Sequence, residues 1–442
     1  MFAVWRAAHH VPIYSDPTKP PYASAYFNWL FYTLYGAIAR LFDDTSLPRV
    51  GRLLTTAFAV IGAITTGWIG FRSARGTALR LAGLAIGVFL FFGPMVGWWA
   101  VTIRPDTGAL FAETLGIILF LALHRAHPTL AVWISVCMFY IAWAFKPTYL
   151  GGLCAVAAFL LVHRRWRDLA TLAGGSVIFW SISLAVGGSA YRASLLETAT
   201  THSNKFLLPL GLTNLLYAGY YLVPLIVLLP WWGQALLRSK PWKERSLAHD
   251  ALLLSALALP VVTALLFYAA CKFGASPNYF FPTATLLTIG TLQGVFPLQR
   301  NPIMPATLAC ALILILECGI LTGLFGKLSL DPYAERLSSC WSVYKNLPEP
   351  RFAYDYKLDL PWLNPHSPHI LLPFNYERDR AAGRVFVGDG VGGMITRGEF
   401  ASLMLPASLV KYDGAALNGY ERGETVEDMV VLRRRPPPPG DP

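Results

Sequence analysis

Four short polar clusters interrupt the apolar runs of this sequence, and each pairs a cation with a helix-breaking or hydrogen-bonding residue. They are Arg104-Pro105-Asp106, Lys146-Pro147-Thr148, His202-Ser203-Asn204-Lys205, and Lys272-Phe273-Gly274 leading to Pro277-Asn278-Tyr279. Arginine offers paired donors to phosphate oxygens, and lysine offers a compact positive charge. Taken together, the clusters predict a cavity that binds an anionic group, most simply a phosphate attached to a lipid.

Each residue also has a structural interpretation. The Arg104 side chain could extend along apolar surface to reach water. Lys146 could cap the C-terminus of a helix, and Asp106 could cap the N-terminus of a helix running to Leu123. The functional interpretation is favoured because the clusters occur together. Within it, Arg104, Lys146 and Lys205 contact the phosphate, while Asp106, Asn278 and Tyr279 position the substrate.

A proline-rich segment, Asp16-Pro17-Thr18-Lys19-Pro20-Pro21-Tyr22, precedes the aromatic stretch at 24–42. The prolines fix the backbone in an extended form. We therefore predict that Lys19 and Tyr22 are held toward the cavity, in a loop that closes over the substrate. The alternative is a rigid surface turn without a role in binding.

The composition predicts the surroundings of these clusters. Apolar and aromatic residues make up 55% of the 442 residues, and only 14% are charged, whereas soluble proteins carry about 25% charged residues. This excludes an ordinary soluble enzyme, a disordered protein and a nucleic-acid binder, and it indicates a polytopic membrane protein. The basic excess lies in residues 1–325, with 22 Lys and Arg against 10 Asp and Glu, so it reports topology rather than a polyanionic partner.

Ten apolar runs approach the length of about 20 residues that a helix needs to cross a membrane. They lie near 53–72, 81–103, 107–124, 129–146, 148–163, 168–187, 210–237, 247–270, 279–297 and 303–325. Loops at one end hold Arg72, Arg75, Arg80, Arg125, Arg164, Arg165, Arg167, Arg238, Lys240, Lys243, Arg245 and Arg300, and loops at the other hold single cations. The positive-inside rule places the cation-rich end in the cytoplasm.

We therefore expect an all-α polytopic membrane domain at 53–325, an outer loop with an interfacial helix at 1–52, and a small extracytoplasmic α/β domain at 326–442. This topology puts Met1 outside the membrane without a signal peptide. We expect that a first helix is missing from the chain, the alternative being an N-terminus that lies along the interface. The predicted location is the bacterial plasma (inner) membrane.

The polar motifs resemble those of the C-type membrane glycosyltransferases. The matching features are Lys-Pro-Pro at Lys19, Arg-x-Asp at Arg104 and Asp106, Lys-Pro at Lys146, and the late outer motif Asn278-Tyr279. The sequence is most similar to polyprenyl-phosphate-sugar-dependent bacterial enzymes of the aminoarabinose transferase and protein mannosyltransferase group. The resemblance covers most of residues 12–325.

This resemblance implies an inverting transfer of a hexose or pentose from a polyprenyl-phosphate donor, at the outer face of the plasma membrane. The acceptor would be a glycan, lipid or protein of the cell envelope. In the family an acidic residue of the first outer loop is the general base, but Asp16 lies too close to Lys19 to match it. We therefore expect the base upstream of Met1, and no catalytic residue is assigned.

Several alternatives stay open. A transporter or flippase of an anionic lipid-linked substrate would place essential charges near the bilayer centre, where Glu113 and Glu317 lie in apolar runs; interhelical hydrogen bonding explains both more simply. A third candidate is a non-catalytic partner in envelope assembly. The sequence indicates no cofactor, and a divalent metal lacks support. Gly388, Gly390 and Gly393 spell GxGxxG, which we interpret as turn glycines rather than a dinucleotide site.

Overall fold

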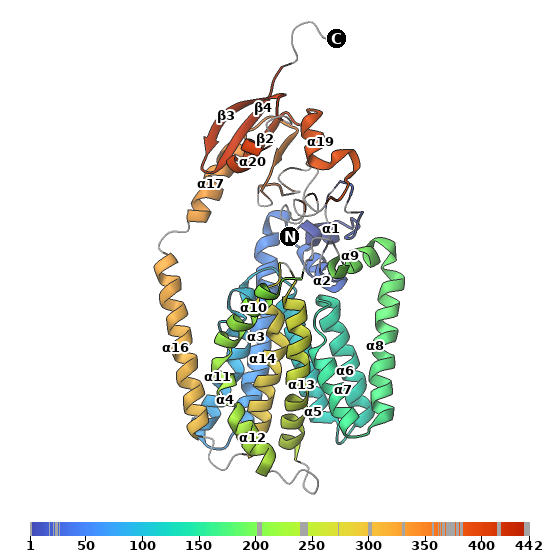
Figure 1. Ribbon diagram of the computed structural model, residues 1–442, viewed down its shortest axis with the longest axis vertical. Coiled ribbons are helices and arrows are strands. Elements are labelled where there is room, and N and C mark those ends of the chain that lie inside the picture. The colour runs from blue at the N-terminus through green and yellow to red at the C-terminus, as the bar shows by residue number, and fades with distance from the viewer. Residues whose placement is uncertain are drawn as a thin grey trace.

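In the computed structural model, a helical bundle carries a small α/β region at one end (Figure 1). The structure describes residues 2–436 except 17, 21, 23–24, 26, 201–205, 239–245, 273, 299–302, 329–331, 356–357, 361, 363, 365–366, 368–375, 377–379, 381–382 and 413–416. Only the backbone is described at 98, 196–200, 238, 320–328, 332–335 and 411–412.

Two short helices open the chain beneath the α/β region (Figure 1). They are α1 (Phe2–Ala8) and α2 (Trp29–Ala39), and the second lies within the aromatic stretch predicted as an interfacial helix. Asn28 begins α2 because its side-chain oxygen accepts a hydrogen bond from the Trp29 amide, which satisfies a donor that the helix itself leaves unpaired. The helices pack closely, since a Cβ atom on Gly36 would lie 2.7 Å from the Ala7 Cβ atom.

All ten predicted runs form helical structure in the part of the chain described. The helices are α3 (Leu47–Ser73), α4 (Thr77–Phe92) with η2 (Gly97–Val101), α5 (Asp106–Leu123), α6 (Pro128–Phe145), α7 (Gly151–Val162), α8 (Trp166–Val186), α9 (Gly188–Thr200), α10 (Leu208–Tyr221), α11 (Val223–Ile226), α12 (Leu229–Arg238), α13 (Leu247–Ala270), η3 (Pro277–Phe280), α14 (Phe281–Ile289), η4 (Gly290–Val295), α15 (Phe296–Leu298) and α16 (Ile303–Leu328). The all-α character predicted for this part is confirmed.

These helices differ in whether they are long and apolar enough to cross a membrane. Five described helices, α3 with its preceding turn, α5, α6, α8 and α13, are long and apolar enough by length and composition. Residues 208–237 form a sixth candidate, which is bent by 69°. α4 has 16 residues and α7 only 12. α6 ends at Phe145 because Pro147 has no backbone donor to continue the helix, and α7 begins only at Gly151.

The C-terminal region contains one sheet of four strands in the described residues, in the order β1-β2-β4-β3. The strands are β1 (Arg351–Ala353), β2 (Ser402–Pro406), β3 (Tyr420–Val426) and β4 (Met429–Arg434), and the helices are α17 (Pro332–Tyr344), α19 (Gly390–Thr396) and α20 (Ala407–Tyr412). β1 and β2 are parallel, and the other neighbours are antiparallel. The α/β region predicted from the sequence is therefore present.

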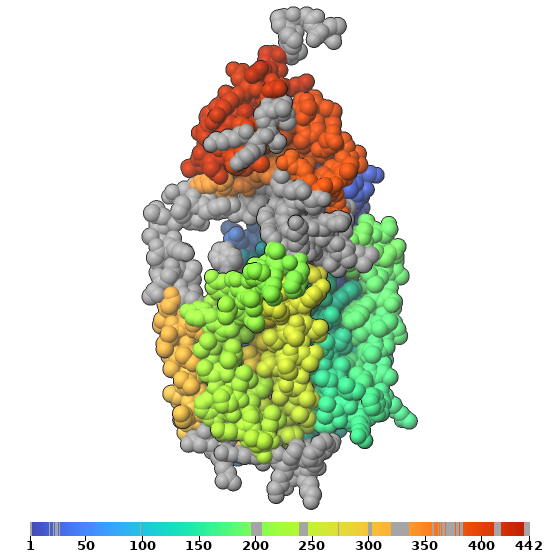
Figure 2. Space-filling view, viewed as in Figure 1, coloured from blue at the N-terminus to red at the C-terminus, as the bar shows by residue number. Residues whose placement is uncertain are grey.

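The N-terminal segment is fastened to this α/β region. Tyr22 is buried in its core, with ring centroids 5.6 Å from Tyr376 and 5.7 Å from Phe386. The Val387 amide donates to the carbonyl oxygen of Thr18 at 2.9 Å. Residues far apart in the chain thus meet at one end of the bundle, and Figure 2 shows the C-terminal region resting above the N-terminal residues.

Candidate functional site

The ends of three helical elements bring Asp106, Lys146 and Asn278 together. Asp106 is the first residue of α5, Lys146 directly follows α6, and Asn278 lies in η3 just before α14. Their exposed fractions are 0%, 6% and 3%. A break at proline precedes or follows each residue in the sequence, so the chain leaves its helix there and polar side chains can turn inward.

One carboxylate oxygen organises this cluster. Asp106 Oδ1 accepts from Lys146 Nζ at 2.6 Å and from Asn278 Nδ2 at 2.7 Å. Ser276 Oγ donates to Asn278 Oδ1 at 2.6 Å, which fixes the orientation of the amide. Lys146 Nζ also lies 4.8 Å from the centre of the Tyr279 ring, within the range of a cation–π contact.

The second carboxylate oxygen has a different environment. Asp106 Oδ2 is buried and has no hydrogen-bond partner among the described residues. Burying such an oxygen unpaired costs free energy, and the cost is larger for a charged group. The Asp106 side chain does not cap α5, but Tyr149 donates its hydroxyl to the Asp106 carbonyl oxygen at 3.0 Å. The cluster therefore has an incomplete hydrogen-bond set around a buried ion pair.

The three cations predicted to contact a phosphate lie in different settings. Lys146 is paired with Asp106, so its charge is balanced within the protein. Arg104 is exposed, and its guanidinium lies 4.4 Å from the centre of the Trp99 ring. Lys205 lies outside the described residues. Lys146 and Arg104 nevertheless flank the start of α5, one buried and one facing solvent.

The predicted loop residues Lys19 and Tyr22 are not part of this cluster. The Lys19 side chain is 63% exposed, and its Nζ lies 3.9 Å from Asp16 Oδ2. Hydrogen bonds from the Thr18 side chain and amide hold the pKa of Asp16 below its ordinary value. Tyr22 instead fills the core of the C-terminal region. The segment is therefore a fastening to that region.

Asn28 is a residue of this site that sequence analysis missed. It is fully buried, and its Nδ2 donates to the carbonyl oxygen of Trp143 at 2.9 Å. The backbone amide of Asn28 donates to the Phe145 carbonyl oxygen at 3.4 Å, and the Tyr191 hydroxyl donates to Asn28 Oδ1 at 2.5 Å. Asn28 thus holds the last turn of α6 directly before Lys146. The sequence feature that could have indicated this role is that Asn28 is an amide side chain within the aromatic stretch at 24–42.

Glu113 lies two turns beyond Asp106 on α5. Its Oε1 accepts from the Gly152 amide at 2.7 Å, at the start of α7. A carboxylate at a helix N-terminus pairs donors that the helix leaves open and interacts favourably with its dipole. Glu113 therefore forms the interhelical hydrogen bond that we preferred over a proton relay.

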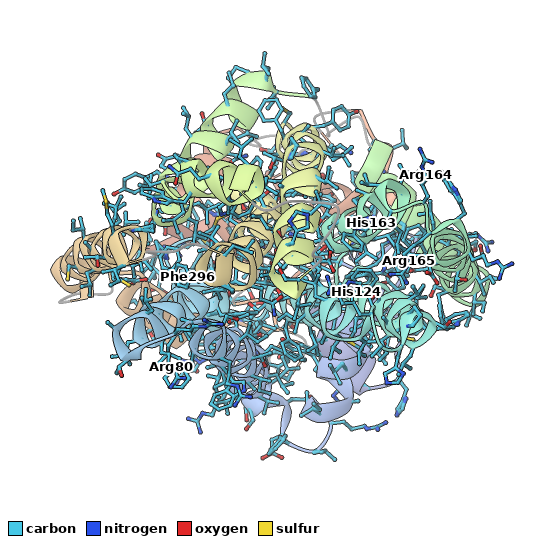
Figure 3. The ribbon with its side chains drawn as sticks, turned by 90° about the horizontal axis from the view of Figure 1, so that it is seen from below. Arg80, His124, His163, Arg164, Arg165 and Phe296 are labelled. Atoms are coloured by element: carbon cyan, nitrogen blue, oxygen red, sulfur yellow. The ribbon has the colours of Figure 1, made fainter. Side chains whose placement is uncertain are left out.

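The opposite end of the bundle is rich in cations, as the loop charges predict. Figure 3 shows this end from below, with Arg80, His124, His163, Arg164 and Arg165 labelled. Here Asp250 Oδ2 accepts from His124 Nε2 at 2.9 Å and from Arg125 Nη2 at 2.5 Å. These contacts fasten the end of α5 to the start of α13. Among the described residues, no group of three or more His, Cys, Asp or Glu could hold a metal ion.

Comparison with known proteins identifies the fold. No family model and no curated protein matches this chain. The crystal structure of ArnT from Cupriavidus metallidurans in the apo state matches with a TM-score of 0.61 and 14% identity, covering 98% of this chain and 91% of that one. The same protein bound to undecaprenyl phosphate matches with a TM-score of 0.60 and 13% identity, covering 98% and 92%. The chain therefore has an ArnT-like polytopic fold.

Proposed function

We propose that this chain is an integral membrane glycosyltransferase that moves a sugar from a polyprenyl-phosphate donor to an acceptor at the outer face of the bacterial plasma membrane. One observation carries the proposal: the buried cluster of Asp106, Lys146 and Asn278 lies at helix ends that the N-terminal segment ties to the α/β region. The fold around it is similar to ArnT, one structure of which contains undecaprenyl phosphate. Residues 1–52 and 326–442 would face outward, and 53–325 would cross the membrane.

The chemistry of the leaving group explains this assignment. When the sugar leaves its lipid phosphate, negative charge develops on the phosphate oxygens, and nearby positioned cations stabilise it. An ammonium has three N–H donors, and Asp106 accepts one from Lys146. A donor phosphate bound beside Lys146 would accept another, while Arg104 would meet the phosphate from the solvent side.

Asp106 would act as a positioning residue. Its carboxylate holds Lys146 and Asn278 in fixed directions and balances the lysine charge until substrate arrives. Attack by an acceptor hydroxyl also needs a proton acceptor, and Asp16 is poorly suited because its pKa is lowered by hydrogen bonds from Thr18. We assign no general base among the residues of the cluster.

The experiment is a transfer assay with the full chain in lipid vesicles. Radiolabelled sugars on undecaprenyl phosphate would be supplied with an envelope fraction, and release of lipid phosphate and labelling of the envelope would be measured. We expect Lys146→Met to lower turnover by about 100-fold, as for loss of a positioned donor, and Arg104→Gln to lower it less. Arg164→Gln, at the opposite end, is the control. Donor turnover that does not depend on Lys146 would contradict the proposal.

A further inference from the structure

A groove on the outer surface of the bundle follows the seam between α3 and α4. Its volume is about 460 Å³, within the range of small-molecule sites. Each wall is a row of apolar side chains spaced four residues apart, a spacing that places them on one face of a helix. The rows are Val60, Ile64 and Trp68 on α3, and Leu84, Val88 and Phe92 on α4. All of these side chains except Val88 are exposed, so the groove is open to whatever surrounds the bundle.

Gly67 makes the groove deep, because it leaves the α3 backbone bare between the two rows. A Cβ atom added at Gly67 would lie 2.8 Å from Leu84 Cδ1 and 3.3 Å from Val88 Cγ2. The α4 side chains therefore rest directly on the α3 backbone, and a larger residue at this position would fill the space.

The length of the groove matches one leaflet of a membrane. On α3 the groove extends from Val60 to Phe71. An α-helix rises 1.5 Å per residue, so this stretch is about 16 Å long. The hydrocarbon core of a bilayer is about 30 Å thick, of which one leaflet makes up about half. One acyl chain of a single leaflet therefore fits along the groove.

Positive charge gathers at one end of the groove. Arg72, Arg75 and Arg80 lie within or beside the turn that joins α3 to α4, and the sequence contains no Asp or Glu between Asp44 and Asp106. None of the three arginines forms an ion pair with a carboxylate in the part of the chain that the structure describes. Figure 3 views the molecule from this end and shows Arg80 at the periphery of the bundle. This positive charge is thus not balanced by neighbouring side chains.

Aromatic rings hold two of these cations at the end of the groove. The Arg72 guanidinium lies 5.5 Å from the centre of the Trp68 ring. The Arg80 guanidinium lies 5.4 Å from the centre of the Phe71 ring, and Arg80 Nε donates to the Ala74 carbonyl oxygen at 3.5 Å. The two rings stack on each other with centroids 6.1 Å apart, and both line the groove. A guanidinium over a ring keeps N–H donors at its edge, where they can meet phosphate oxygens.

We propose that this groove binds an anionic phospholipid, with one acyl chain between α3 and α4 and the headgroup phosphate on Arg72 and Arg80. Cations beside membrane-spanning helices attract anionic lipids. In a zwitterionic lipid an ammonium group already balances the phosphate, so an anionic lipid gains more from these arginines. The inference rests on the place of the chain in a membrane and not on glycosyl transfer. Under the proposed orientation the groove faces the cytoplasmic leaflet, away from the Asp106 cluster.

Native mass spectrometry of the full chain in detergent measures lipid binding directly. Phosphatidylglycerol, phosphatidylcholine and undecaprenyl phosphate would be added separately, and the fraction of protein that carries one lipid gives each Kd. We expect phosphatidylglycerol to bind more tightly than phosphatidylcholine with the same acyl chains. Equal binding of these two lipids would overturn the proposal.

Removal of the two arginines tests the headgroup contacts. Each cation near a membrane surface changes the affinity for an anionic lipid about fivefold, so we expect Arg72→Gln with Arg80→Gln to weaken phosphatidylglycerol binding about 30-fold. The control is Arg164→Gln with Arg167→Gln, which removes two cations from the same end outside the groove and should bind like the wild type. Equal losses in the two double variants would show attraction by net charge alone and overturn the proposal.

Filling the groove tests the acyl-chain contacts. Ile61 and Ile64 are both exposed on α3, by 50% and 65%, but of the two only Ile64 lines the groove. We expect Ile64→Trp to weaken phosphatidylglycerol binding and Ile61→Trp to leave it unchanged. Unchanged binding in Ile64→Trp would overturn the proposal. So would a loss confined to undecaprenyl phosphate, because the groove would then hold the chain of the donor lipid.

Discussion

Asp106 accepts hydrogen bonds from two donors on a single oxygen, so the stability of each contact depends on the other residues of the cluster. Lys146 and Asn278 both donate to Oδ1, and all three side chains are buried. Removing one partner of a buried ion pair leaves the other charge uncompensated, and this typically costs about 3–5 kcal/mol. Replacing both partners is less costly, because neither charge is then buried alone.

This coupling gives a prediction for a double-mutant cycle. We expect Asp106→Asn and Lys146→Met each to destabilise the protein by about 3 kcal/mol or more, and the double variant to be clearly more stable than either single one. Thermal unfolding in detergent, followed by fluorescence, measures this. The double variant should fold, and it should still fail to cleave the donor because Lys146 is absent. Additive losses of stability would contradict the pairing.

The sequence predicted the members of this cluster but not their pairing. Asp106, Lys146, Asn278 and Tyr279 were chosen because they lie at helix ends with few cations, and the structure brings all four together. The pairing of Lys146 with Asp106 depends on how α5 and α6 pack, which no local pattern encodes. Tyr22 was predicted to face the cavity, but it packs in the α/β region. No local pattern reveals this, because its partners lie more than 350 residues away.

Glycines allow the helices α3 and α4 to approach with their backbones in contact. A Cβ atom on Gly83 would lie 2.3 Å from the Gly70 carbonyl oxygen, and one on Gly70 would lie 2.1 Å from the Gly83 oxygen. Thr66 Oγ1 donates across the interface to the Gly87 carbonyl oxygen at 2.7 Å. Small residues of this kind drive helix association in membranes by close packing and hydrogen bonding.

A matched pair of substitutions tests this packing. Gly83→Leu forces the two helices apart, and we expect a loss of about 1–3 kcal/mol or more, as for overpacking elsewhere. Gly174→Leu on α8 is the control, since no atom lies within 4 Å of a Cβ atom at that position. The midpoint of thermal unfolding in detergent measures both. Equal effects of the two substitutions would show that the backbones do not touch.

At the scale of elements, hydropathy predicted where helices occur but not where they bend. The run at 210–237 is predicted as one span, and the structure bends it by 69° between Leu208–Tyr221 and Val223–Leu237. Pro224 and Pro230 lie in the first turns of α11 and α12, and proline is accommodated there because no amide donor is needed. Apolar composition continues through such a bend, so a hydropathy average does not detect it.

The N-terminal segment connects the two parts of the molecule. Tyr22 is 4% exposed within the core of the α/β region, while Asn28 bonds the end of α6 in the helical bundle. Only five residues lie between these anchors. The segment therefore joins the α/β region to the backbone that precedes Lys146, a connection that composition and motif spacing did not reveal.

Removing one anchor tests this connection. Truncating a buried aromatic ring typically costs about 3–5 kcal/mol, so we expect Tyr22→Ala to release the segment and expose residues 12–28 to limited proteolysis. Tyr22→Phe keeps the ring and loses only a hydrogen bond of 3.4 Å to the Val387 carbonyl oxygen. It should be cleaved like the wild type. Equal protection of all three proteins would contradict the anchoring role.

The fastening of Tyr22 also orders events during synthesis. Its hydrogen-bond partner Val387 is 365 residues further along the chain, which a ribosome adding about 5–20 residues per second reaches roughly 20–70 s later. Throughout that interval the membrane helices are being inserted while Tyr22 lacks the partners that bury it in the α/β region. Synthesis of the α/β region is thus the step that fixes the Tyr22 segment in place.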